Sequence, residues 1–266
     1  MGAPDIALIG AGRMGLALAQ GWVKSKSKPT LALVDPKPSA AAEALGRKRS
    51  VTLNADPEPA SVVVVAVKPQ VFESAVPDIL PWIGPKTLVL SIMAGIRIKK
   101  MSGLLETERV VRAMPNTPGA IGRGVSVTAF PDGISKTDQE KVSELLSPLG
   151  LVEGPVPEDK ISAVTALSGS GPAYLFLLVE AMAGAGEAEG LSPELAETLA
   201  RETVAGAAAL MMETGEAAKD LRKAVTSPGG TTQAALDLLM DENGVPSLML
   251  RAMRAAAIRE RNLSSG

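Results

Sequence analysis

The N-terminal part of the chain places an apolar strand directly before a glycine fingerprint. Residues 6–9 are Ile-Ala-Leu-Ile, and Gly10-x-Gly12-x-x-Gly15 then opens a segment with helical periodicity. After a strand, the first glycine makes a tight turn, the second admits a pyrophosphate, and the third lets helix and strand pack closely. An acid, Asp35, follows about twenty positions later, as in dinucleotide-binding units. The pattern predicts a βαβ unit that binds a dinucleotide, with an ordinary βα turn as the alternative.

Apolar runs and helical segments alternate through the rest of the first part. The run at 62–67 is apolar throughout, which is typical of a strand buried on both faces of a parallel sheet. Such alternation predicts a doubly wound α/β domain. The expected strands are 6–9, 31–34, 62–67, 88–92, 110–113 and 125–129. The expected helices are 14–24, 40–45, 71–79, 98–104 and 138–149.

Beyond about Pro157 the strand-like runs vanish, and Ala, Leu, Met and Glu dominate to the end. The first helix expected there, at 172–189, is apolar on most sides, which predicts burial inside its domain or against another subunit. We expect an α/β fold, with an N-terminal Rossmann-type doubly wound sheet in residues 1–157 and an all-α C-terminal domain in residues 158–266. The further expected helices are 192–214, 217–224, 231–240 and 247–261.

The composition excludes several kinds of chemistry. The 266 residues include no cysteine and no histidine. Disulfides, thiolate nucleophiles, imidazole acid–base catalysis and zinc sites built from these residues are excluded, and no metal site is expected. The 27 basic and 29 acidic residues nearly balance, and only 2% of residues are aromatic. Because a general nucleic-acid binder needs a basic bias and stacking aromatics, that class is excluded too.

The sequence also bears on location. No charged stretch precedes an apolar run at the N-terminus, so no secretory signal is expected. The longest apolar runs, at 62–67 and 174–179, are too short to span a bilayer, so no membrane association is expected. A chain without cysteine fits a reducing compartment. These features predict a soluble cytoplasmic protein.

Three loops follow expected strands at the carboxyl edge of the sheet, where ligands of open α/β folds bind. Ala66-Val67-Lys68-Pro69 ends the third strand, Met93-Ala94-Gly95 follows the fourth, and residues 114–118 follow the fifth near the expected nicotinamide. Each loop alone fits a structural role, but together they trace one ligand-binding face. The candidate cofactor residues there are Ala66, Val67, Lys68, Pro69, Met93, Ala94, Gly95 and Asn116.

The acid at the end of the second strand bears on the choice of cofactor. Asp35 can accept hydrogen bonds from an adenosine ribose and repel a 2′-phosphate, which favours NADH slightly over NADPH. Lys37 and the run Arg47-Lys48-Arg49 offer cations for that phosphate. We interpret the basic run as a solvated helix end, and both cofactors stay open.

A second glycine motif, Ser227-Pro228-Gly229-Gly230-Thr231-Thr232, runs into the expected helix 231–240. Adjacent glycines permit a tight turn, and the first N–H groups of a helix lack intrahelical partners. These donors and the helix dipole suit a small anion such as a carboxylate. The candidate substrate contacts are Ser227, Gly230, Thr231 and Thr232.

Taken in order, these motifs resemble those of pyrroline-5-carboxylate reductases. The resemblance rests on the fingerprint, Val67-Lys68-Pro69-Gln70, and the segments 114–118, 168–174 and 227–232, and it covers essentially the whole chain. It implies reduction of 1-pyrroline-5-carboxylate to L-proline by NADPH or NADH, the last step of proline synthesis. It also implies a helical second domain that forms interlocked homodimers, often assembled into decamers, with the substrate site shared between chains.

Transferred residue by residue, the resemblance places substrate contacts at Glu158 and at the Gly230-Thr231-Thr232 turn. Relatives often carry a small hydroxyl residue where this chain has Asp35, so the usual contact to a 2′-phosphate is not carried over. The implied cofactor contacts outside the three loops are Gly10, Ala11, Gly12, Arg13, Met14, Gly15, Asp35 and Asn54.

The chemistry of a cyclic imine fits a chain without histidine or cysteine. The C=N bond is already electrophilic, so reduction needs a hydride, a positioned carbon and a proton on nitrogen, and the cofactor supplies the difficult step. Our hypothesis is that the amides of Gly230, Thr231 and Thr232 hold the substrate carboxylate. The Thr232 hydroxyl is then the catalytic group that binds the ring nitrogen. The alternative is that Thr231 and Thr232 only cap the helix.

Two other functions stay open. One is a reductase of similar layout, such as a β-hydroxyacid dehydrogenase or an imine reductase for other substrates. Hydroxyacid dehydrogenases of this build place a lysine on the helix that opens the second domain, and this chain has none between Ile161 and Lys219. The other is a dinucleotide sensor without turnover, against which the intact 227–232 turn argues.

Overall fold

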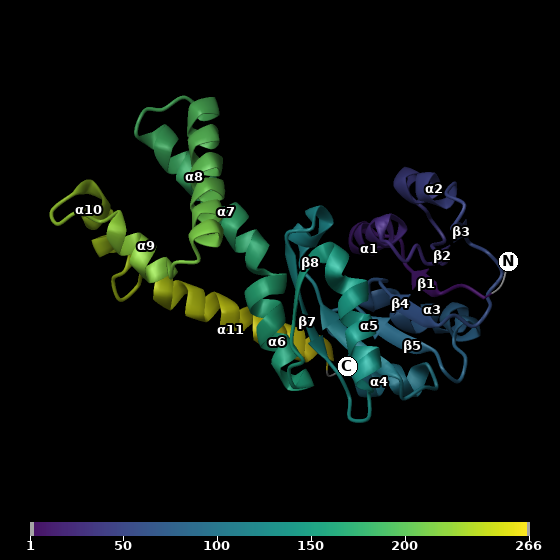
Figure 1. Cartoon of the computed structure of the whole chain (residues 1–266). Helices are drawn as coiled ribbons and strands as arrows, with labels where there is room; N and C mark the ends of the chain where they lie inside the picture. The colour runs from purple at the N-terminus through teal and green to yellow at the C-terminus, as the bar shows by residue number, and fades with distance from the viewer. Residues whose placement is uncertain (1–2, 265–266) are drawn as a thin grey trace. The chain divides into compact units, whose positions relative to one another are not determined.

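The computed structural model describes residues 3–264 of the chain. Contacts group them into two units: a first unit up to Ser170 and from Ala256 onward, and a second unit at Gly171–Ala255 (Figure 1). This grouping differs from the expected division at residue 157. Ile161 and Ala166 lie in the first unit because their side chains are buried there.

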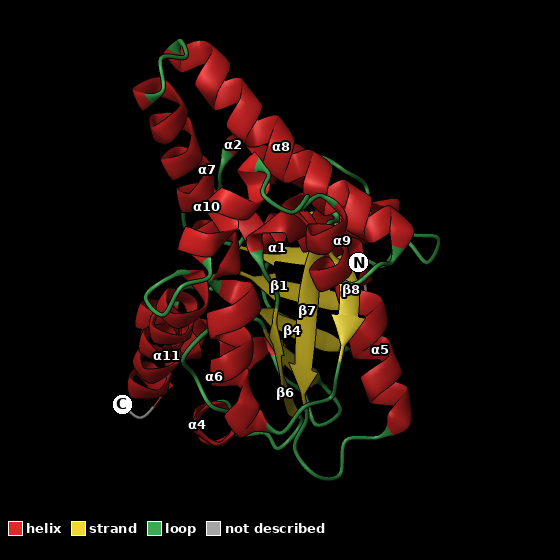
Figure 2. Cartoon of the chain, turned by 90° about the vertical axis from the view of Figure 1, so that its left-hand side faces the viewer, coloured by secondary structure: helices red, strands yellow, loops and turns green. Residues whose placement is uncertain are grey.

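Among the described residues, eight strands form one sheet in the order β3-β2-β1-β4-β5-β6-β7-β8, drawn in yellow in Figure 2. Neighbouring strands are parallel except β6 and β7. The doubly wound sheet is thereby confirmed. The sequence prediction lacks the two edge strands, because β3 has only three residues and β8 alternates half-buried with exposed side chains. The strands are β1 (Ile6–Ile9), β2 (Leu31–Val34), β3 (Val51–Leu53), β4 (Val62–Val65), β5 (Leu88–Ser91), β6 (Val110–Met114), β7 (Gly124–Ala129) and β8 (Gly150–Glu153).

Helices cover both faces of the sheet because its central strands are apolar on both sides. The four valines of β4 are fully buried and alternate between two cores, one with Trp22 and the other with Phe72. This arrangement is the physical reason for the uninterrupted apolar run at 62–67. The helices of the first unit are α1 (Arg13–Lys24), α2 (Ala40–Gly46), α3 (Phe72–Ile79), α4 (Ile98–Leu104), α5 (Lys136–Leu146) and α6 (Ile161–Val164).

The segment before the second unit is more helical than the sequence indicates. Helix α6 leads into a π-helical turn at Thr165–Gly169, whereas no helix was expected between residues 150 and 171. Serine, threonine and glycine in this segment favour caps and turns over helices, which hides the helical signal. Within it, Thr165 and Ser168 donate their hydroxyls to carbonyls one turn back, at 2.8 and 2.9 Å.

The second unit consists of helices, as expected. Ser192 caps α8 by accepting a hydrogen bond from Leu195 N–H at 3.3 Å, and proline follows at the first helical position. Gly186 of α7 lies against Ala196 of α8, so small residues let these two helices approach closely. The helices are α7 (Gly171–Ala188), α8 (Pro193–Thr214), α9 (Ala218–Ala224), α10 (Thr231–Leu239) and α11 (Val245–Ser264), whose end belongs to the first unit.

Helix α7 exposes its apolar side chains. Within the described chain none of its residues is buried, and Phe176 and Leu177 are 63% and 64% exposed. The prediction that this helix is buried inside its own domain is therefore wrong, and burial against another subunit stays a prediction. The helical stretch Glu158–Ala188 is long and apolar enough to cross a membrane, which the short apolar runs did not indicate. Length and composition alone do not distinguish a membrane helix from one that a second subunit covers.

Candidate cofactor and substrate sites

The glycine fingerprint lies between the carboxyl ends of β1 and β4, where the strand order reverses direction. Gly10 has a φ of +95°, and a Cβ there would lie 2.9 Å from the Ala66 carbonyl. A Cβ at Gly15 would overlap the carbonyl oxygen of Gly10. These two glycines therefore make the turn and the close helix–strand packing that their spacing predicts.

Gly12 faces open space at the start of α1. No other part of the described chain comes within 4 Å of a Cβ added there. Its φ of −70° is open to any residue, so the glycine matters for the space it leaves and not for its backbone. The first N–H groups of α1 have no intrahelical partners and point toward that space. The fingerprint thus fits the pyrophosphate of a dinucleotide.

The Asp35 carboxylate binds the backbone of the fingerprint. Its Oδ2 accepts a hydrogen bond from Ala11 N–H at 2.8 Å, and its Oδ1 accepts one from Lys37 N–H at 2.9 Å. Asn54, which has a φ of +50°, accepts from the N–H of Asp35 and donates its amide to the Asp35 carbonyl, both at 2.9 Å. Asn54 therefore holds Asp35 at the carboxyl end of β2, beside the fingerprint.

The three candidate loops follow β4, β5 and β6, which are parallel neighbours, so they meet at one edge of the sheet. Lys68 is exposed and begins a 3₁₀ turn at Pro69–Val71. Met93 is buried, and its N–H donates to Ser91 Oγ at 3.2 Å. The Asn116 side chain accepts a hydrogen bond from Val125 N–H at 2.9 Å, which ties its loop to β7.

A buried guanidinium joins two carboxylates near the loop that follows β5. Arg112 of β6 is 3% exposed, and its Nη1 lies 3.1 Å from Glu158 Oε1 while its Nη2 lies 3.4 Å from Glu260 Oε1. Glu158 Oε1 also accepts a hydrogen bond from Ile98 N–H at 2.7 Å. Glu158, which the sequence analysis expects to contact the substrate, holds the start of α4 in the structure.

Glu260 lies near the end of α11 and is 4% exposed. Burial raises the pKa of Glu260, but hydrogen bonds from Ser162 and Ser264, the charge of Arg112 and the N–H of Gly95 together hold it below its usual value. Because these groups stabilise the charged form, Glu260 is ionised at neutral pH.

The turn at 227–232 lies in the second unit. Gly229 has a φ of +70°, and Gly230 N–H donates to the Ser227 carbonyl at 3.0 Å. Gly230 is the capping residue of α10, so neither Thr231 nor Thr232 takes that position. Both threonines are exposed in the first turn of the helix. The turn thus offers helix N–H donors and two hydroxyls to solvent.

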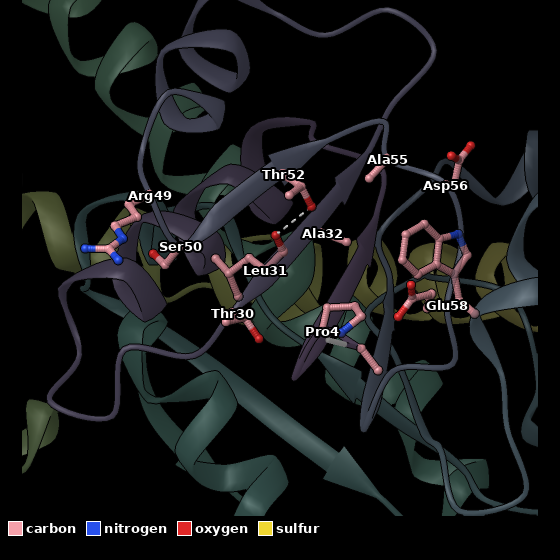
Figure 3. Close-up of a pocket in the computed structure, with 12 residues that line it drawn as sticks. Pro4, Thr30, Leu31, Ala32, Arg49, Ser50, Thr52, Ala55, Asp56 and Glu58 are labelled. Atoms are coloured by element: carbon pink, nitrogen blue, oxygen red, sulfur yellow. Dashed lines mark hydrogen bonds between the residues drawn. The ribbon is translucent and has the colours of Figure 1, made fainter. Parts of the chain in front are cut away.

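A cavity of about 670 Å³ lies toward the amino ends of β1, β2 and β3 (Figure 3). Its lining includes Pro4, Thr30 and Ser50, which precede those strands. Among the described residues, no candidate cofactor or substrate residue lines this cavity. Arg49 of the basic run also lines it, at the edge of the sheet opposite Asp35.

Two family descriptions match the chain. The first, NADP oxidoreductase coenzyme F420-dependent, covers residues 5–95, and the second, pyrroline-5-carboxylate reductase dimerisation, covers residues 158–263. A pyrroline-5-carboxylate reductase from Pisum sativum is 38% identical over 97% of this chain and 96% of its own length. The chain belongs to the pyrroline-5-carboxylate reductase family.

Solved structures of pyrroline-5-carboxylate reductases share the fold of the whole chain. One from Coxiella burnetii has a TM-score of 0.88 at 33% identity and covers 98% of this chain and 99% of its own. One from Plasmodium falciparum, solved with NADP bound, has a TM-score of 0.81 at 26% identity and covers 99% of both chains. As a member of this family, the chain is an oxidoreductase that uses a nicotinamide cofactor, and its helical part is a dimerisation domain.

Two charged residues near the candidate cofactor site were not predicted from the sequence. Arg112 is the single charge in the otherwise apolar strand β6, and a charge in a buried strand could have been recognised from the sequence as a candidate functional residue. Glu260 gives no such signal, because its partners come from segments far away in the chain.

Proposed function

We propose that the protein reduces the C=N bond of 1-pyrroline-5-carboxylate to give L-proline, the last step of proline biosynthesis. The observation that carries this proposal is the 38% identity, over 97% of the chain, to a reductase of that name. The fingerprint that fits a dinucleotide and the turn that suits a carboxylate support it. The lack of cysteine and histidine is compatible with it, because the reaction needs no protein nucleophile.

The cofactor side of the proposed site belongs to the first unit. When bound, the reduced nicotinamide would supply the hydride. The N–H groups at the start of α1 would bind the pyrophosphate over Gly12, and Asp35 would accept a hydrogen bond from the ribose. The loops at 66–69, 93–95 and Asn116 would border the nicotinamide and exclude water from it.

The substrate side belongs to the turn that opens α10. The N–H groups of Gly230, Thr231 and Thr232 would bind the carboxylate, with Ser227 as a further contact. Glu158, a residue of the first unit, is proposed as a separate substrate contact. The Thr232 hydroxyl would hydrogen-bond the ring nitrogen, which gains a proton as the imine becomes an amine. Positioning would supply most of the acceleration, since effective-molarity gains reach several kcal/mol.

We further propose that NADH is slightly preferred over NADPH. The Asp35 carboxylate is held at the end of β2, where it would repel a 2′-phosphate. Arg49 lies toward the other edge of the sheet, which removes one candidate cation for that phosphate. Lys37 stays close to Asp35 in sequence and is exposed. The relative from Plasmodium falciparum was solved with NADP, so the preference is proposed for this chain alone.

Replacing Asp35 by serine is expected to shift the ratio of kcat/KM values for NADPH and NADH about tenfold toward NADPH, or about 1.4 kcal/mol. The change removes the negative charge that opposes the phosphate and leaves a small hydroxyl at the end of β2. Steady-state kinetics with both cofactors measure the ratio. Asp56→Ser, at an exposed position after β3, is the matched control and should leave it unchanged. An unaltered ratio in Asp35→Ser would remove Asp35 from cofactor choice.

We propose a cytoplasmic homo-oligomer built from dimers, with a decamer as its larger assembly. The dimerisation domain leaves large apolar side chains exposed on α7, α8 and α10, including Phe176, Met212 and Leu238. A second copy of this domain would cover them in water, and this accounts for the apolar stretch Glu158–Ala188 without a membrane.

The proposed function is tested by mixing the purified protein with 1-pyrroline-5-carboxylate and either reduced cofactor. Reduced-nicotinamide absorbance should fall while L-proline accumulates. No fall with either cofactor would favour the dinucleotide sensor. A fall only with other cyclic imines, or a rise in this absorbance when a β-hydroxy acid is mixed with the oxidised cofactor, would favour the related reductases.

A further inference from the structure

The end of α11 packs directly against the loop that follows β5. Gly95 N–H donates to Glu260 Oε1 at 3.3 Å, and both residues belong to the first unit. A Cβ added at Gly95 would lie 3.0 Å from the Cβ of Leu263 on the same helix. Gly95 has a φ of +69°, which favours glycine. The loop is thus shaped to receive this helix.

Glu260 accepts hydrogen bonds from several elements of the first unit besides the Gly95 loop. Its Oε1 accepts from Arg112 Nη2 at 3.4 Å and from Ser264 Oγ at 3.1 Å. Its Oε2 accepts from the Ser162 hydroxyl of α6. Because each of these neighbours is a donor and the carboxylate is buried, Glu260 is held in one position, and the N–H of Gly95 with it.

Arg112 extends this network to the far end of the same loop. Its second nitrogen binds Glu158, and Glu158 accepts from Ile98 N–H. Gly95 and Ile98 therefore each donate to a carboxylate, and both carboxylates pair with one guanidinium. The backbone at both ends of residues 95–98 is fixed by side chains from outside the loop.

We propose that Glu260 is a positioning residue for the nicotinamide cofactor and acts through Gly95. The inference rests on the proposed function, in which residues 93–95 border the nicotinamide. The N–H and C=O of a trans peptide point in opposite directions. By binding Gly95 N–H, Glu260 turns the Ala94 carbonyl away from α11 and fixes it as an acceptor for the cofactor. The C-terminal helix thereby sets the shape of a cofactor loop more than 160 residues earlier in the chain.

The test compares three variants of Glu260 in the full-length protein. Glu260→Ala removes the acceptor and Glu260→Asp shortens its reach, so each should raise the KM and the Kd for NADH, by about fivefold to tenfold for alanine and at least about threefold for aspartate. Glu260→Gln keeps an acceptor of the same reach and should rescue NADH binding to within about twofold of the unchanged protein. Glu140→Gln, at an exposed position of α5, is the control for carboxylate loss.

The Kd is measured by NADH fluorescence without imino acid, so the result does not depend on turnover. Protein that binds NADH but fails to reduce 1-pyrroline-5-carboxylate would end the proposed reaction and leave the Glu260 comparison valid. A lower Tm in Glu260→Ala with unchanged KM and Kd for NADH would overturn the positioning role. If Glu260→Ala does not fold, the Kd values for NADH of Glu260→Asp and Glu260→Gln are compared instead. Equal Kd values overturn the inference, and a higher Kd for Glu260→Asp supports it.

Discussion

Replacing Thr232 by valine is expected to lower kcat by about 30-fold to 900-fold, on the order of 2–4 kcal/mol, as for a lost oxyanion donor. Valine keeps the shape of the side chain but removes the hydroxyl proposed to bind the ring nitrogen. Because Gly230 caps α10, the hydroxyl is not needed to start the helix, and the Tm should stay within about 2 °C. Turnover and thermal unfolding are measured on the same preparation.

Thr137→Val provides a matched control for this change. Thr137 is the second residue of α5, as Thr232 is of α10, and it is exposed. Ser135 caps α5 by accepting from Asp138 N–H at 3.1 Å, so Thr137 is not needed as a cap either. Both variants should unfold like the unchanged protein, and only Thr232→Val should lose turnover. Normal turnover in Thr232→Val would remove this hydroxyl from the mechanism.

Replacing Gly12 by alanine is expected to raise the KM for NADH by about tenfold to a hundredfold, or roughly 1.4–2.7 kcal/mol, with an unchanged Tm. Apart from its own neighbours in the chain, the added Cβ meets no described atom within 4 Å, and the φ of −70° suits any residue, so the fold should tolerate it. The same Cβ would occupy the space proposed for the pyrophosphate. Steady-state kinetics and thermal unfolding separate the two effects.

Gly103→Ala is the control, because Gly103 is an exposed glycine of α4 whose added Cβ also meets no described atom within 4 Å beyond its own helix. It should leave the KM for NADH unchanged and raise the Tm slightly, since alanine favours a helix. A normal KM in Gly12→Ala would mean that the pyrophosphate does not pass over Gly12. Gly15→Ala allows no such separation, since its Cβ would overlap the Gly10 carbonyl and disturb the fold itself.

Much of the fold could be predicted because its sequence signals are local. The run at 62–67 is apolar throughout since β4 is buried on both faces, and this pattern requires no knowledge of the neighbours. Helix α8 carries its own start signal in Ser192 and its following proline. Strands β3 and β8 escaped prediction because an edge strand is defined by the strand it pairs with, not by its own composition.

The candidate sites also contain some features that follow from local sequence and others that depend on tertiary structure. The turn made by Gly10 and the packing at Gly15 follow from their spacing, and the structure shows both. The Arg112–Glu260 pair joins residues from β6 and α11, so only tertiary structure brings it together. Likewise, the bond between Asp35 and Ala11 N–H depends on the position of β2 beside β1. Features that depend on residues close in sequence were therefore predictable, as was the shared edge of the loops that follow parallel strands. Individual contacts between residues far apart in the sequence were not.

The exposed leucine, phenylalanine and methionine side chains of α7, α8 and α10 have a consequence for how the protein folds and assembles. Because this helical part buries few side chains by itself, we expect its core to be completed when two chains pair, with folding and pairing as one bimolecular event. A substitution on these helices therefore acts on the population of assembled enzyme before it acts on any reacting group. In a cell that makes the unchanged and the substituted chain together, each substituted chain would also destabilise the dimers that it forms with unchanged chains.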